Sequence, residues 1–286
     1  MLPIRQILFP VDFSEPCRAM VPTVLRLAHH FHCPINLLHA YDLPVAFYGE
    51  ISPIDLIDTV DLERSHTAQL RQFAAEMMPA EAHTQFVSRG DAADVIHQFV
   101  QRNGTDLIVM PTSGRGPLRR LLLGSVTSKV LHDVSCPVWT GAHEGHENLP
   151  PRWPIRNILC AISLEEESQA IAQAAAAFAA SFGARLHLMH AVGYPVPTID
   201  VDYEYFRKQM VEIATQKLQA IRWDAKIEAA CLITEGSVIQ NIHDQALATQ
   251  ADLVIVGRGH AQGAVSRLWS DLYDVIRQSP CPVLSI

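Results

Sequence analysis

The sequence predicts an α/β protein built from two tandem, doubly wound modules, each a mainly parallel five-stranded sheet with helices on both faces. Short runs rich in Ile, Leu and Val alternate with longer segments of helical periodicity, which is typical of strands joined by crossover helices. The runs are almost continuously apolar, as in parallel strands buried on both faces. The chain also repeats itself, because residues 155–166 (IRNILCAISLEE) resemble residues 4–15 (IRQILFPVDFSE).

The repeat continues along the whole chain with its segments in the same order. Three further pairs of segments match: residues 35–45 with 186–196, 105–110 with 251–256, and 135–141 with 280–286. A repeat unit of about 140 residues is a duplicated domain and is too long for a solenoid repeat. We therefore predict a first module over residues 1–142, a polar, proline-rich linker over 143–154 and a second module over 155–286.

The elements of the first module follow from the apolar runs and their boundaries. Strands are expected at residues 6–11, 35–41, 82–90, 106–110 and 136–140. Helices are expected at residues 15–31 and 56–78, from near Asp91, and between the last two strands. Ser14 is a candidate N-cap of the first helix, because its hydroxyl can accept a hydrogen bond from a first-turn N–H. Pro22 marks a candidate kink in the same helix.

Composition and charge exclude several classes of protein. The 286-residue chain has a formal net charge of -8, whereas a nucleic-acid-binding protein needs a broad basic face. No apolar run approaches the roughly 20 residues that a membrane span requires, and the N-terminus lacks the features of a signal peptide. The six cysteines are scattered without a CxxC pair, so we interpret them as reduced thiols and expect a cytoplasmic protein.

The stretch 111–128, PTSGRGPLRRLLLGSVTS, lies where a ligand is expected. Ligands of doubly wound sheets bind beyond the carboxyl ends of the strands, where the strand order reverses, and the first and fourth strands end at Asp12 and Met110. Gly124 and Ser125 stand at a predicted helix start, where free N–H groups and the helix dipole favour an anion. The alternative interpretation is that the glycines only turn the chain, Ser125 caps the helix and the loop arginines are solvated.

The same loop carries a spacing found in a known family. Gly114, then nine residues, then Gly124 and Ser125 resembles the signature Gly-x2-Gly-x9-Gly-Ser/Thr of nucleotide-binding universal stress proteins. The segments ILFPVDFSE, LLHAYD, DLIVM and LLLGSVTSKVLHDVSCPV fit the same family. The resemblance covers the chain twice. It implies a tandem universal stress protein with the Rossmann-like, adenine nucleotide alpha-hydrolase-like fold.

The resemblance implies that ATP or another adenine nucleotide binds in the first module, with Mg²⁺ as an optional companion. The implied contacts are Val11 and Ala40 at the adenine, Asp12 at the ribose or adenine, Met110 between base and ribose, and Gly114, Gly124, Ser125 and Val126 at the phosphates, with positive charge from Arg115. One position departs from the family pattern, because Pro111 stands at the first glycine and has no N–H to donate. The departure puts the ribose side of the loop in question and leaves the phosphate site at the helix start intact.

The second module has lost part of the signature. If its loop is one residue shorter, Trp269 replaces the third glycine, and a Trp side chain would obstruct a phosphate. Without that deletion Asp271 replaces the serine, and its charge would repel a phosphate. Ser163 stands at the position of Asp12, and three glutamates follow it. We predict that the second module does not bind ATP in the family manner.

Other candidate sites have simpler interpretations. His29 and Cys33 are one helical turn apart and suggest zinc, but histidines at a helix C-terminus also interact favourably with the helix dipole, which we prefer. His39 and His190 repeat at the end of the second strand and are interpreted as packed, hydrogen-bonded residues. The chain has no G-x-S-x-G motif and no Walker lysine, so we assign no catalytic residue and no metal ligand.

The leading hypothesis is a cytoplasmic stress-response protein that binds an adenine nucleotide in its first module and acts as a sensor or regulator. Two alternatives stay open: a scaffold that binds no nucleotide or a different small ligand, which Pro111 favours, and a slow ATP-hydrolysing enzyme. The modules are expected to form an intramolecular pseudo-dimer through edge strands 136–140 and 281–286, which would cover exposed sheet edges. A homodimer is also left open, and neither nucleic acid nor a membrane is an expected partner.

Overall fold

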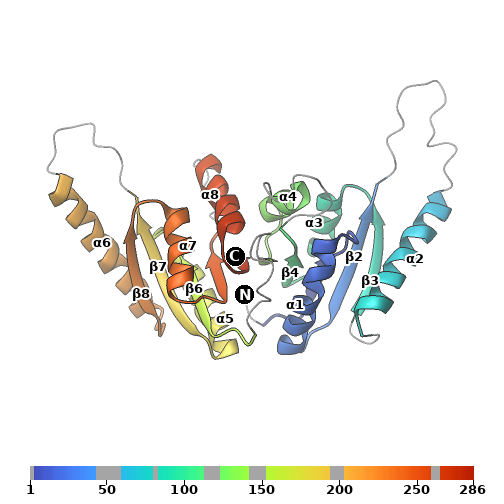
Figure 1. Ribbon diagram of the computed structural model, residues 1–286, viewed down its shortest axis with the longest axis horizontal. Helices are drawn as coiled ribbons and strands as arrows, with labels where there is room; N and C mark the ends of the chain where they lie inside the picture. The colour runs from blue at the N-terminus through green and yellow to red at the C-terminus, as the bar shows by residue number, and fades with distance from the viewer. Residues whose placement is uncertain are drawn as a thin grey trace, which may run out of the picture. The chain divides into compact units, whose positions relative to one another are not determined.

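The computed structural model describes residues 3–42, 59–79, 83–112, 123–141, 153–193, 203–258 and 265–286. These residues form two compact units, Pro3–Trp139 and Thr140–Ile286 (Figure 1). Two units confirm the duplication that the repeat predicts. The bounds of the linker, 143–154, and the packing of one module against the other stay predictions.

The first unit alternates strands and helices as predicted. In chain order its elements are β1 (Ile7–Pro10), α1 (Glu15–Phe31), β2 (Ile35–Tyr41), α2 (Thr59–Met77), β3 (His83–Arg89), α3 (Ala92–Asn103), β4 (Leu107–Met110), α4 (Ser125–Asp133) and β5 (Val138–Thr140). The strand order is β3-β2-β1-β4-β5, and β1 pairs in parallel with both β2 and β4. This is the doubly wound order, in which the chain reverses direction across the sheet between β1 and β4.

The second unit repeats the same order. Its elements are β6 (Asn157–Ala161), α5 (Ser168–Phe182), β7 (Arg185–Val192), α6 (Tyr203–Asp224), β8 (Ala230–Glu235), α7 (Val238–Ala248), β9 (Leu253–Val256), α8 (Val265–Gln278) and β10 (Val283–Ser285). The strand order is β8-β7-β6-β9-β10, with parallel pairing of β6 to both β7 and β9. In both units helices cover the two faces of the sheet (Figure 1).

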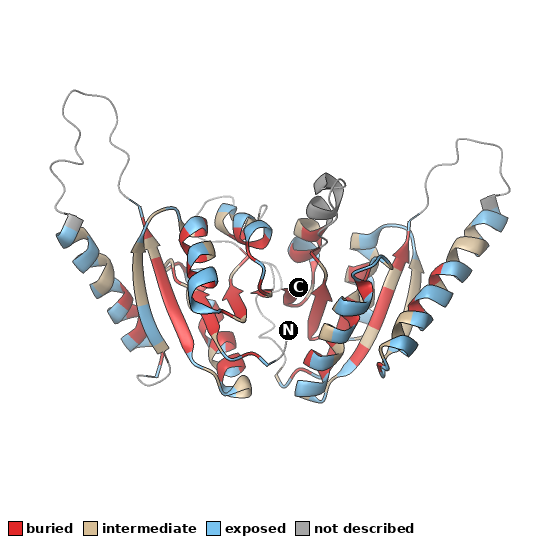
Figure 2. Cartoon of the chain, turned by 180° about the vertical axis from the view of Figure 1, so that it is seen from behind, coloured by how far each residue is buried: buried red, intermediate tan, exposed pale blue. Residues whose placement is uncertain are grey.

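The core of each unit lies in its central strands. Ile7, Leu8 and Phe9 of β1 are fully buried, and every residue of β4 and β9 is buried (Figure 2). The outer strands β3 and β8 are only partly buried. A strand covered on both faces needs apolar side chains on both, which confirms the interpretation of the continuous apolar runs as parallel strands.

The helix ends confirm most of the predicted boundaries. Ser14 caps α1, and its hydroxyl accepts a hydrogen bond from the N–H of Cys17 (3.3 Å). Asp91 caps α3 by accepting from two first-turn N–H groups. Pro22 lies inside α1, which continues past it to Phe31. No described helix is long and apolar enough to span a bilayer.

Two aspartates that sequence reasoning missed anchor the first strand of each unit. The Oδ2 atom of Asp106 accepts hydrogen bonds from the backbone N–H groups of residues 5 and 6, at 2.8 and 3.1 Å. Asp252 does the same for residues 156 and 157, at 2.8 and 3.0 Å. Asp252 is buried, whereas Asp106 is partly exposed. The repeated Asp-Leu that precedes each apolar run is therefore a structural clamp.

All six cysteines are free thiols, as predicted. Burial raises the pKa of the Cys17 and Cys160 thiols to about 12. Such groups are inert at neutral pH because the thiolate is the reactive form.

Candidate functional site

The reversal of strand order brings the predicted adenine-pocket residues to one edge of the first sheet. Leu8 pairs with Ile108, which places Met110 level with Pro10, the last residue of β1. Pro10 in turn pairs with Leu38, so Ala40 of β2 is level with the residues that follow β1. Val11 and Met110 are 4% exposed. Two apolar walls therefore flank the point at which β1 ends.

Asp12 sits in a tight turn directly after β1. The next residue, Phe13, has a left-handed backbone (φ 64°), which turns the chain sharply into α1. The Oδ1 atom of Asp12 accepts hydrogen bonds from the N–H (3.0 Å) and the hydroxyl (2.6 Å) of Ser14. Its Oδ2 atom makes no hydrogen bond with any described residue and the side chain is partly exposed. The carboxylate is thus oriented through one oxygen, while the other has no described hydrogen-bond partner.

The start of α4 lies beside the end of β4. The N–H of Gly124 donates to the Thr112 carbonyl (2.9 Å), and the Thr127 hydroxyl donates to the Pro111 carbonyl (3.2 Å). Gly124 is the N-cap and supplies no side-chain hydrogen bond, while Ser125 is exposed. Among the described residues, none accepts a hydrogen bond from the first-turn N–H groups of Ser125 and Val126, as is usual at a helix start. The predicted helix start at Gly124-Ser125 is confirmed.

Pro111 enters this arrangement through its carbonyl group. The described hydrogen bond at Pro111 uses its carbonyl oxygen, which accepts from Thr127, and does not require the N–H that proline lacks. Gly114 and Arg115 lie outside the described residues, and their predicted roles stay predictions.

His39 ties the end of β2 to the end of β1. Its Nδ1 donates to the Val11 carbonyl (2.7 Å), and its Nε2 lies 3.0 Å from Nδ1 of His66 in α2. The His66 ring stacks on Tyr41, with ring centres 4.5 Å apart. In the second unit His190 makes the same contact with the Ile162 carbonyl (2.8 Å). This confirms the interpretation of both repeated histidines as packed, hydrogen-bonded residues.

The His66 side chain is expected to make the first unit less stable in acid. Burial lowers the pKa of His66, so the folded protein binds a proton there less readily than the unfolded chain does. The free energy of unfolding should therefore fall as the pH drops through about 6.5, the unfolded value, towards the folded pKa. We expect His66→Gln, which keeps a donor towards His39 but does not titrate, to flatten this fall in urea unfolding at pH 7, 6 and 5. Parallel pH profiles for the two proteins would contradict the assignment.

Among the described residues, the corresponding edge of the second unit differs from that of the first. Ser163 replaces Asp12, and its hydroxyl lies 3.4 Å from that of Ser168. Leu164 repeats the left-handed turn (φ 67°), but the helix N-cap Glu167 makes no side-chain cap bond. At the end of β9, a Cβ placed on Gly257 would lie 2.3 Å from Cδ1 of Ile171, so this side chain fills the space over the strand end.

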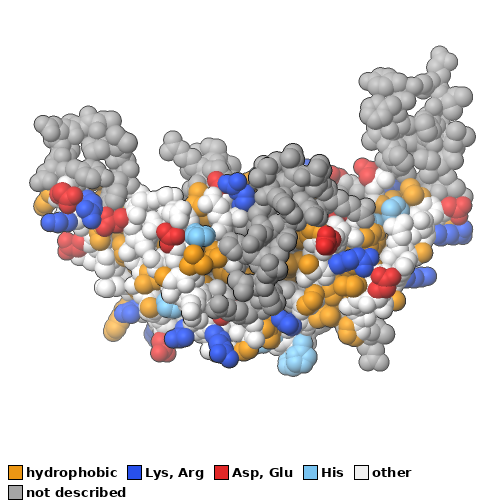
Figure 3. Space-filling model, viewed as in Figure 1, with side chains coloured by type: hydrophobic (Ala, Val, Ile, Leu, Met, Phe, Trp, Pro, Cys, Tyr) orange, Lys and Arg blue, Asp and Glu red, His pale blue; other side chains and the backbone are white. Residues whose placement is uncertain are grey.

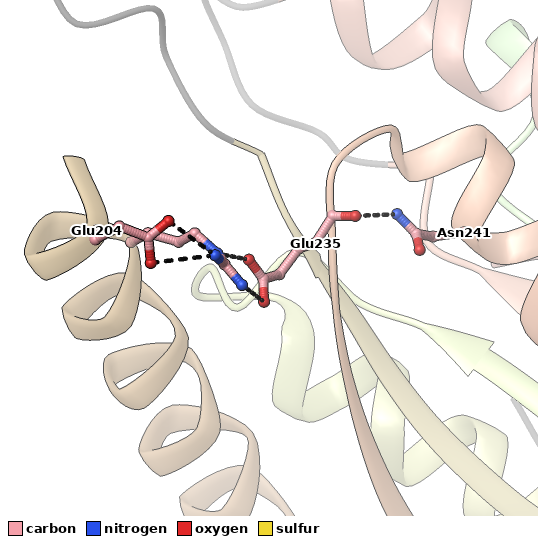
Figure 4. Close-up of polar contacts among 4 residues, drawn as sticks. Glu204, Glu235 and Asn241 are labelled. Carbon is pink, nitrogen blue, oxygen red and sulfur yellow. Dashed lines mark hydrogen bonds and ion pairs between the residues drawn. The ribbon is translucent and has the colours of Figure 1, made fainter.

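Ion pairs within the unit occupy the outer part of this edge. Arg207 of α6 bridges Glu204 and Glu235, with its Nη1 3.2 Å from Glu204 Oε1 and its Nη2 3.3 Å from Glu235 Oε1 (Figure 4). The Glu235 carbonyl also accepts from the Asn241 side chain (3.0 Å). The side chains of Trp269 and Asp271 lie outside the described residues. The described contacts at this edge are internal to the unit.

Comparison with protein families matches the universal stress protein family to residues 3–140 and again to residues 154–286. The chain belongs to the universal stress protein family. A universal stress protein of Methanocaldococcus jannaschii is 28% identical over 136 residues, which are 47% of this chain and 79% of that protein. A universal stress protein of Thermus aquaticus is 29% identical over 134 residues, or 47% of this chain and 96% of that one.

Solved structures of similar length share the two-unit fold. A universal stress protein from Archaeoglobus fulgidus has a TM-score of 0.65 and 21% identity, covering 98% of this chain and 95% of its own. A putative universal stress protein from Pseudomonas aeruginosa has a TM-score of 0.62 and 16% identity, covering 99% and 93%. These likenesses confirm the tandem α/β architecture.

Proposed function

We propose that this universal stress protein binds an adenine nucleotide in its first unit and acts as a nucleotide-dependent regulator in a stress response. The observation that carries the proposal is that two groups follow the adjacent strands β1 and β4, where the strand order reverses. One is the Asp12 oxygen without a described hydrogen bond, and the other is the start of α4 at Gly124. A carboxylate can accept hydrogen bonds from ribose hydroxyl groups, and a helix start can donate hydrogen bonds to phosphates. The two together therefore suit a nucleotide.

The parts of the nucleotide are assigned by the chemistry of each wall. The adenine lies against the apolar Val11, Ala40 and Met110, and the ribose hydroxyls donate to the free oxygen of Asp12. The phosphates accept hydrogen bonds from the N–H groups of Ser125 and Val126 and from the Ser125 hydroxyl, with Gly114 and Arg115 of the loop completing the cradle. Mg²⁺, when it accompanies the nucleotide, is carried on the phosphates.

The second unit is assigned no nucleotide. It lacks the carboxylate of Asp12, and Ile171 packs over the end of β9. The stoichiometry is therefore one nucleotide per chain.

The nucleotide content of the purified protein tests the proposal. We expect denaturation and mass spectrometry to release about one adenine nucleotide per chain, or calorimetric titration of the emptied protein with ATP to saturate near that ratio. Saturation at two ATP per chain would contradict the assignment to the first unit alone. If no nucleotide is released and titration with ATP gives no heat, the proposal is overturned, and a scaffold or a different ligand is favoured.

A further inference from the structure

An open groove lies at the amino-terminal edge of the second sheet, at the opposite end of the strands from the ligand-binding edge. It is enclosed by the end of α5, the start of β7, the end of α6 and the start of β8, and has a volume of about 970 Å³. Side chains of the second unit alone line it. The volume suits a ligand of ordinary small-molecule size.

The groove is positively charged in a chain that is negative overall. Arg185, Arg222 and Lys226 line it, against the single carboxylate of Glu228. None of the three cations forms an ion pair with a described carboxylate, and the one hydrogen bond of their side chains runs from Arg222 Nη1 to the Ala229 carbonyl (3.5 Å). In Figure 3 Lys and Arg side chains lie along the lower edge of the second unit, the edge at which β7 and β8 begin in Figure 1.

His187, the third residue of β7, also lines the groove. Its Nδ1 is buried and has no hydrogen-bond partner among the described residues. Burial and the neighbouring Arg185 lower the pKa of His187, which favours the neutral ring. Because this nitrogen is buried, it does not offer a hydrogen bond to a ligand in the open groove.

An aromatic ring stands at the rim. Trp223 lines the groove, yet it is 79% exposed, the highest value among the large apolar side chains described as exposed. An exposed Trp beside cations offers a flat face on which a planar group can stack.

Lys226 has a left-handed backbone at the end of α6. After the last residue of α6, Asp224, the N–H groups of Lys226 and Ile227 donate to the Trp223 and Arg222 carbonyls, and Lys226 has a left-handed backbone (φ 54°). Glycine is the favoured residue there, and Gly183 fills that role at the end of α5 across the groove (φ 62°). A lysine tolerates this conformation only with strain.

Neither the helix dipole nor the fold accounts for the whole cluster. Cations at the end of α6 are favoured by its dipole, but Arg185 and His187 belong to a strand. In the first unit, the positions that match them by the offset aligning His39 with His190 hold Pro34 and Asn36. Arg185 and His187 therefore have no basic counterparts at these positions of the first unit.

We propose that this groove binds a small aromatic anion, whose carboxylate or phosphate group is held by Arg185, Arg222 and Lys226 and whose ring stacks on Trp223. The guanidinium groups provide paired N–H donors to either oxyanion. The site is independent of the nucleotide site, because it lies in the other unit.

Binding of simple naphthyl probes tests this proposal in the full-length protein. We expect 1-naphthyl phosphate or 1-naphthoate to bind saturably in calorimetric titration, and neutral 1-naphthalenemethanol to bind at least about tenfold more weakly. Gly124→Asp should leave this binding unchanged, which separates it from occupation of the nucleotide site. No saturable binding of either anion, or equal binding of the neutral probe, would overturn the proposal.

Variants of the groove identify the site. Arg185→Gln and Lys226→Gly should each lower the affinity for the anion by about tenfold. Lys217→Gln, on α6 but outside the groove, should leave this affinity unchanged. Lys226→Gly should fold at least as stably as the parent, because glycine relieves the left-handed strain, so its loss of binding cannot come from unfolding. Trp223→Ala should lower the affinity for 1-naphthyl phosphate, because it removes the ring on which the naphthyl group stacks. Unchanged affinity in the groove variants would place the probe elsewhere and refute the assignment.

Discussion

Gly124→Asp is expected to abolish tight binding of adenine nucleotide while leaving the first unit folded. The added carboxylate would occupy the first-turn N–H groups of α4 and repel the phosphates. Two charges 4 Å apart repel by about 4 kcal/mol at an effective dielectric constant of 20. After screening by salt, we expect ATP affinity to fall by at least about 100-fold in calorimetric titration.

The stability of this variant should not fall, which makes the result interpretable. Gly124 has an extended backbone (φ -61°, ψ 142°) that any residue adopts, and aspartate is a favourable N-cap. Urea unfolding should therefore give an unchanged or slightly higher free energy. Gly124→Ser is the matched control, because serine also caps the helix but carries no charge. If both variants bind ATP as the parent does, the helix start does not hold the phosphates.

Asp252→Ala is expected to cause the largest loss of stability among the polar substitutions considered for the second unit. The buried Asp252 carboxylate accepts two backbone hydrogen bonds, from residues 156 and 157. Removing it leaves two N–H groups at the start of β6 without an acceptor, and each hydrogen bond to a charged group contributes about 1.5–3 kcal/mol. We expect the free energy of unfolding in urea to fall by about 3–6 kcal/mol.

Two comparisons control this prediction. Asp252→Asn keeps one acceptor oxygen of the same shape and should cost less than the alanine variant. Asp106→Ala removes the equivalent clamp in the first unit, where the carboxylate is partly exposed and water can replace it. A loss at Asp252 no greater than that at Asp106 would show that burial does not set the strength of the clamp.

The sequence by itself determined the architecture of this protein. Strand runs, helix periodicity and caps such as Ser14 and Asp91 are encoded within a few residues of one another, so they can be read locally. The duplication needed only a comparison of the chain with itself. The signature around Gly124 indicated the edge at which we propose that a nucleotide binds, because parallel strands bring their carboxyl ends to the same side of a sheet.

Only the tertiary structure decided how the individual groups at these sites are used. One oxygen of Asp12 accepts hydrogen bonds from Ser14 and the other has no described partner. His39 of β2 donates a hydrogen bond to the carbonyl of Val11, which follows β1. The groove at Arg185 and Lys226 joins segments 41 residues apart, neither of which carries a motif. Such contacts depend on the register between strands and on where each helix ends in space. Local sequence patterns do not specify those quantities; the packing of the whole unit does.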